Sequence, residues 1–116
     1  MGVMSTEMKF PDFDIAADIK FLSTSEGGRK TPALSSYRPN HDFGLESGLV
    51  DAVHEYIGID RAEPGGSVYA HLVFLSPNLL KGKLSLGQTF RVQEGDKLIA
   101  LGKISKIFSD ELGNDS

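Results

Sequence analysis

The chain has 116 residues with 40% hydrophobic and 24% charged side chains, no cysteine, and a formal net charge of −4 at pH 7. These values fit one globular domain and exclude disulfides, thiolate metal sites and cysteine nucleophiles, while the acidic balance disfavours nucleic acid as a partner because phosphate contacts need Lys and Arg. No stretch approaches the roughly 20 apolar residues of a membrane span, so we expect a cytoplasmic protein without a membrane partner.

The first strand is predicted close to the N-terminus. Residues 1–11 are expected to form a flexible leader, and the domain begins at residue 12. From Ile15 to Phe21, apolar residues alternate with more polar ones, which is the period of two that a half-buried strand shows. Paired glycines within residues 23–29 then permit positive φ, and a tight loop is expected there.

The middle of the chain is less clear. An extended stretch at residues 33–43 contains Pro39, which cannot donate a ladder hydrogen bond, so an edge strand or a bulge is expected. Residues 44–62 are compatible with either a short helix or a strand. The turn at residues 63–66 is followed by a second well-defined strand at residues 67–75, in which apolar positions again alternate.

Two further strands are predicted in the last third of the chain. Residues 88–93 and 97–108 flank the hairpin turn of residues 94–96. The first half of the last strand carries apolar residues on both sides, which indicates burial of both faces. Residues 109–116, SDELGNDS, are expected to be a disordered acidic tail, so that the domain spans residues 12–108. Several strands separated by turns predict a small barrel or sandwich.

The sequence offers little catalytic chemistry. His41, His54 and His71 lie far apart and match no short metal-ligand spacing. We expect His41 in a loop or on an edge, His54 in a solvated turn or helix, and His71 on the polar face of a strand. No serine lies in a G-x-S-x-G elbow, and the glycine-rich turns match no phosphate-binding pattern. We therefore predict no catalytic residue, no metal site and no cofactor.

Residues 17–39, ADIKFLSTSEGGRKTPALSSYRP, contain E-G-G-R, then T-P, then Y-R-P. In these motifs and their spacing the chain resembles the third, C-terminal domain of elongation factor Tu, whose pattern runs E-G-G-R-H-T-P and then G-Y-R-P. Residues 90–102, FRVQEGDKLIALG, are similar to F-A-I-R-E-G-G-R-T-V-G-A-G of the same family. The resemblance covers most of the chain and is weakest at residues 43–62.

The resemblance implies an all-β fold, a six-stranded antiparallel Greek-key barrel like the C-terminal domain of the elongation factor. It also implies no GTP binding by this domain alone, because the family binds GTP in a separate domain. In the family this domain contacts tRNA, the exchange factor and the GTPase domain. Equally, an arginine of such a motif can simply tie down a loop, and a strand tyrosine can simply pack its ring. The candidate contacts to a partner protein or RNA are Arg29, Lys30, Tyr37, Arg38, Glu94 and Gly95.

Three functions from different classes stay open at this point. The leading interpretation is a non-catalytic module that uses one face of the barrel to bind a partner protein. The second is a translation-associated accessory that binds tRNA through Arg29, Lys30, Arg38 and the turn at Glu94 and Gly95, with steep salt dependence. The third is a small-molecule enzyme or carrier that uses the mouth of the barrel, which is disfavoured because barrels of this size fill their interior with side chains.

Overall fold

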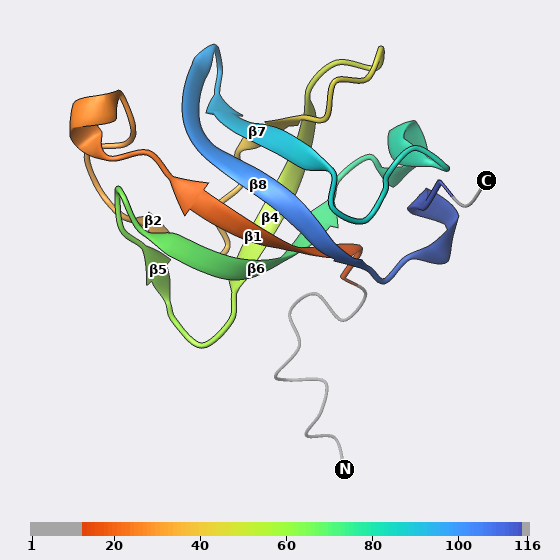
Figure 1. Cartoon of the computed structure of the whole chain (residues 1–116), viewed down its shortest axis with the longest axis horizontal. Helices are drawn as coiled ribbons and strands as arrows, with labels where there is room; N and C mark the ends of the chain where they lie inside the picture. Colours follow the sequence, from red (N-terminus) through yellow and green to blue (C-terminus); the bar gives the residue numbers. More distant parts are fainter. Residues whose placement is uncertain (1–12, 115–116) are drawn as a thin grey trace.

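The computed structural model of the protein describes residues 13–114 (Figure 1). Strands dominate this part of the chain; two short 3₁₀ helices lie in the connections and a third follows the last strand. The strands are β1 (Ile15–Phe21), β2 (Ala33–Leu34), β3 (Asn40–Asp42), β4 (Val50–Tyr56), β5 (Arg61–Ala62), β6 (Ser67–Phe74), β7 (Thr89–Glu94) and β8 (Lys97–Ile107). The 3₁₀ helices are η1 (Thr24–Glu26), η2 (Pro77–Leu80) and η3 (Asp110–Leu112).

Six of the strands form a closed antiparallel barrel in the order β1-β6-β4-β3-β7-β8. The strands β3, β4 and β6 neighbour one another in turn, and β7, the next barrel strand along the chain, returns to lie beside β3, which is a Greek-key arrangement. The predicted all-β, six-stranded antiparallel barrel is therefore confirmed. The remaining strands, β2 and β5, pair with each other in a separate two-stranded sheet.

The core follows from the alternation along each strand. On β6, Val68, Ala70, Leu72 and Phe74 are buried and the residues between them are not, as the period of two predicts. The pairing of β7 with β8 shifts register between Val92 and Gln93, which marks a bulge. Beside this bulge the consecutive residues Ile99 and Ala100 on β8 are both buried. Leu101, however, is 47% exposed, so the predicted burial of both faces of the strand is wrong beyond the bulge.

The ambiguous middle segment is a strand, so the helical alternative is wrong. In β4, Val50, Ala52, His54 and Tyr56 are all buried, with Asp51 only half-buried between them. The stretch at residues 33–43 is interrupted near Pro39, as expected, because β2 belongs to the small sheet and β3 belongs to the barrel. No helix within residues 13–114 has the length and apolar character needed to cross a bilayer.

The predicted disordered tail is wrong for residues 109–114. Leu112 in η3 is fully packed in the hydrophobic core, and its carbonyl accepts a hydrogen bond from the Leu84 amide at 2.9 Å. The Asn114 amide in turn donates to the Leu84 carbonyl at 2.7 Å, so η3 lies beside the segment that follows η2 (Figure 1). The apolar contact of one leucine orders an otherwise polar segment. The predicted leader at residues 1–11 and the last two residues of the tail lie outside the described residues.

Candidate functional site

The E-G-G-R motif is a capped turn that returns the chain to the barrel. The Ser23 side chain accepts from the Glu26 amide at 3.2 Å, and the Glu26 carboxylate accepts from the Ser23 amide at 2.8 Å, which is a capping box around η1. Gly27 ends η1 with a φ of 98°, in the left-handed region that favours glycine. A Cβ atom at Gly28 would lie 2.3 Å from the Leu22 carbonyl oxygen, so this position admits no side chain.

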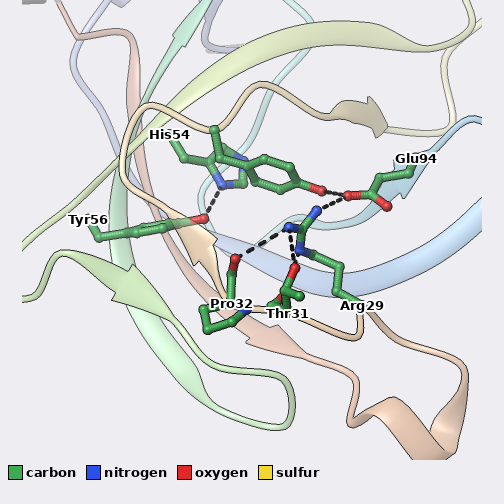
Figure 2. A network of polar contacts seen from close by, with 7 residues as sticks. Arg29, Thr31, Pro32, His54, Tyr56 and Glu94 are labelled. Carbon is green, nitrogen blue, oxygen red and sulfur yellow. Dashed lines mark hydrogen bonds and ion pairs between the residues drawn. The ribbon is translucent and has the colours of Figure 1, made fainter.

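The turn places Arg29 at the centre of a polar network (Figure 2). Its Nη1 donates to Glu94 Oε2 in an ion pair that bridges to the end of β7. Its other nitrogens donate to the Thr31 carbonyl at 3.1 Å, the Thr31 hydroxyl at 3.2 Å and the Pro32 carbonyl at 3.3 Å. The guanidinium also lies 4.8 Å from the centroid of the Tyr37 ring. Arg29 therefore ties the loop after η1 to the β7–β8 hairpin. Of the two roles that the sequence left open for it, fixing a loop or contacting a partner, this is the first.

Tyr37 and Glu94 complete this network. The Tyr37 hydroxyl donates to the same Glu94 Oε2 that receives the Arg29 bond. Burial, followed by the neighbouring Glu94, raises the pKa of Tyr37 far above its ordinary value, so it stays a neutral donor. Burial alone would raise the pKa of Glu94, but the hydrogen bonds from Tyr37 and Arg29 outweigh it and the pKa is lowered. Glu94 is thus ionised at neutral pH.

A second chain of hydrogen bonds runs inside the barrel. His41 Nδ1 lies 3.2 Å from the Val50 carbonyl, His41 Nε2 lies 2.8 Å from His54 Nε2, and His54 Nδ1 lies 3.2 Å from the Tyr56 hydroxyl. A carbonyl only accepts, so neutral His41 donates from Nδ1 and accepts at Nε2. It follows that His54 donates from Nε2 and that Tyr56 donates to His54. Each ring nitrogen has one role, and both rings are neutral.

Both histidines lie fully buried in the barrel, so the expected loop or edge position of His41 and the solvated position of His54 are wrong. Burial lowers the pKa of His41 to about 4, and burial together with nearby His41 lowers the pKa of His54 well below its ordinary value. His71 lies on the outward side of β6, as predicted, and packs against the rings of Phe13 and Phe108. Reading residues 50–56 as a strand would have placed His54 inside the barrel.

The structure brings together three of the six predicted contact residues: Arg29, Tyr37 and Glu94. Gly95 follows Glu94 in the hairpin turn, with a φ of 62°. Lys30 and Arg38 are exposed and make none of the contacts of the network. Within the described part of the chain, no three His, Asp or Glu side chains gather where they could hold a metal ion. The network of Arg29, Tyr37 and Glu94 acts as a clamp, because its contacts fix residues 29–38 against the barrel.

Beside this clamp lies a surface that sequence reasoning missed, which we call the apolar rim and define as Leu34, Ile57 and Ile59. These side chains are 61%, 46% and 50% exposed. Leu34 pairs with Arg61 on the open face of the small sheet, opposite the buried pair Ala33 and Ala62. The Ser35 amide donates to the Asp60 carbonyl at 2.9 Å and the Ser36 amide to the His54 carbonyl at 2.7 Å, which holds the two segments of the rim together.

No protein-family model matches the chain.

Proposed function

We propose that this chain is a non-catalytic binding module and that its partner is a protein. The observation that carries the proposal is the apolar rim, where three large aliphatic side chains are exposed on two segments joined by backbone hydrogen bonds. Grouped exposed aliphatic residues with polar neighbours are typical of protein interaction sites. Arg38, exposed on the same segment as Leu34, supplies a charge at the edge of the surface.

The clamp of Arg29, Tyr37 and Glu94 supports this function by stiffening the surface in advance. It anchors both ends of the segment between residues 29 and 37, and Leu34 lies between these anchors. A segment that is already ordered loses less conformational entropy when it binds, so more of the contact energy contributes to affinity. In this proposal the three residues position the binding surface and do not themselves contact the partner.

The similarity of residues 17–39 and 90–102 to the third domain of elongation factor Tu supports a partner within the translation apparatus. It also keeps RNA as a second candidate, which the exposed cations Lys30 and Arg38 favour. The internal bonds of Arg29 weigh against it, because they leave fewer free charges for phosphate contacts. If tRNA is the partner, Arg38→Ala weakens binding and affinity falls steeply with salt.

The test is affinity capture from lysate of the source cells with three versions of the full chain. The wild type and Leu86→Asp, which changes an exposed leucine outside the rim, are expected to retain the same protein partner. The double variant Ile57→Asp and Ile59→Asp is expected to lose it, while its circular dichroism spectrum and melting temperature stay close to wild type. Equal capture by all three versions, or recovery of RNA alone that Arg38→Ala abolishes, would overturn the protein-partner proposal.

A further inference from the structure

A cleft among the described residues lies away from the clamp and the apolar rim. It has a volume of about 830 Å³ and crosses five barrel strands at residues 18–20, 42–44, 67–69, 89–91 and 101–103. In each of the three central segments the middle residue, Ile19, Phe90 or Gly102, is buried and faces the core. The side chains on either side of each are exposed. The floor of the cleft is therefore the outer face of the barrel wall.

The strand register places three cations close together on this floor. Lys20 on β1 lies opposite Leu101 on β8, and Leu101 lies opposite Arg91 on β7. Lys103 is two residues along β8 from Leu101 and therefore points to the same side. Adjacent strands are about 4.8 Å apart and diagonal neighbours about 7–8 Å, so the three cations surround Leu101.

Nearby acids reduce the positive charge of this group. Asp18 and Asp42 also line the cleft, which gives three cations against two carboxylates on a chain whose net charge is −4. Asp18 lies directly opposite Lys103, and Asp42 opposite Arg91. Yet the ion pairs found among residues 13–114 all lie elsewhere. Lys20 donates to the Gly65 carbonyl, and beside the hydrogen bonds from Ser23 its charge also helps to lower the pKa of Glu26. The centre of the cleft is suited to an anion.

We infer that this cleft binds a small phosphorylated ligand that carries a planar ring. A phosphate, with its double negative charge and several acceptor oxygens, complements Lys20, Arg91 and Lys103 at once. The exposed Leu101 supplies an apolar floor, and the half-buried Tyr69, two strands away from Lys103, supplies a ring for stacking. A volume of about 830 Å³ falls in the range of small-molecule sites.

This site is separate from the proposed protein-binding surface, since neither the rim nor the clamp contributes a residue to the lining. The test is isothermal titration of the full chain at low salt with AMP, UMP, adenosine and inorganic phosphate. At least one nucleotide is expected to saturate a single site, and adenosine and phosphate alone to bind about tenfold more weakly or less, because each keeps only half of the contacts.

Two variants and one control locate the binding. Arg91→Ala is expected to weaken the nucleotide about tenfold or more, since it removes hydrogen bonds to a charged group. Tyr69→Leu is expected to weaken the nucleotide but not inorganic phosphate. Lys83→Ala removes an exposed lysine outside the cleft and is expected to leave both affinities unchanged. The rim variant that loses the protein partner should bind nucleotide normally.

Three results would overturn the inference. The first is no saturable binding of either nucleotide up to about 10 mM. The second is an equal effect of Arg91→Ala and Lys83→Ala, which would indicate unspecific attraction to positive charge. The third is a short single-stranded oligonucleotide that binds far more tightly than AMP and UMP and loses its affinity in Arg91→Ala, which would identify the cleft as a nucleic-acid site instead.

Discussion

At the scale of single residues, the buried pair His41 and His54 makes the stability of the barrel depend on pH. The two Nε2 atoms, 2.8 Å apart, share one hydrogen, so a second proton between them would set two N–H donors against each other and place a positive charge in the core. Burial lowers the pKa of His41 to about 4 from 6.5, and the pKa of His54 is lowered well below 6.5. Below a pH of about 6.5, the unfolded chain therefore binds protons that the folded chain does not bind.

We predict that the free energy of unfolding is constant above the ordinary histidine pKa of about 6.5 and falls as the pH drops from there toward 4. The slope is about 1.4 kcal/mol per pH unit for each histidine that protonates only on unfolding. Urea denaturation at pH 7, 6, 5 and 4 measures it. His71→Gln, which removes the histidine outside the core, should keep most of the slope. A stability that does not change between pH 7 and 5 would contradict the hydrogen-bond assignment of the pair.

A second prediction at this scale concerns Glu94. Glu94→Gln keeps the shape of the side chain but removes the charge that Arg29 and Tyr37 both contact, and it should destabilise the fold by about 1–2 kcal/mol. Combining it with Tyr37→Phe should cost less than the sum of the two single changes, because both break the same contact. The control is Glu111→Gln, whose exposed ion pair with Lys81 is 3.9 Å long and should contribute little. Additive effects would show that the network is not coupled.

At the scale of elements, the capped turn at η1 requires glycine because a side chain has no space there. Gly28→Ala would place a Cβ atom 2.3 Å from the Leu22 carbonyl oxygen and 2.9 Å from that of Ser23, both in the backbone. Gly27→Ala meets no atom within 4 Å but must adopt a φ of 98°. We expect a cost of about 1–2 kcal/mol for Gly27→Ala and a larger one for Gly28→Ala, measured by urea denaturation. The reverse order would show that the turn moves easily.

The same scale shows which elements the sequence can predict. The strands β1 and β6 follow from alternation, because their inward positions are all apolar. The strand β4 does not, because its inward His54 reads as polar and Val53 is buried as well. His54 can be buried because a hydrogen-bond partner satisfies its ring nitrogen. That partner, His41, lies on a different strand, so the sequence of β4 alone does not reveal it.

The clamp was predictable only in part. The motif resemblance indicates Arg29, Tyr37 and Glu94, but their mutual contact depends on the β7–β8 hairpin meeting the loop after η1, 65 residues earlier in the chain. The apolar rim and the cleft depend on the strand register in the same way. Periodicity along one segment carries no information about which outward side chains will be neighbours.

At the scale of the whole molecule, the two proposed binding surfaces share one rigid barrel but no residues. The apolar rim is built on the small sheet and the loop after β4, and the cleft is built on β1, β3, β6, β7 and β8 of the barrel wall. A closed barrel has no free edge and deforms little, so a ligand in the cleft should leave the rim in place. Titration of the partner protein with and without saturating nucleotide should give the same affinity. A change of more than a few-fold would instead indicate coupling between the surfaces.

The segment after β8 also contributes to the stability of the whole molecule, because Leu112 is 1% exposed and joins the hydrophobic core cluster with Leu80 and Leu84. Leu112→Ala should cost about 2–4 kcal/mol, since it removes buried methyl groups and leaves a cavity. Domains of this size have a total stability of about 5–15 kcal/mol, so thermal or urea unfolding should shift clearly. Leu86→Ala, which changes a leucine that is 67% exposed, should stay within about 0.5 kcal/mol of wild type. If both variants unfold like wild type, residues 109–114 are an appendage to the barrel and contribute nothing to its core.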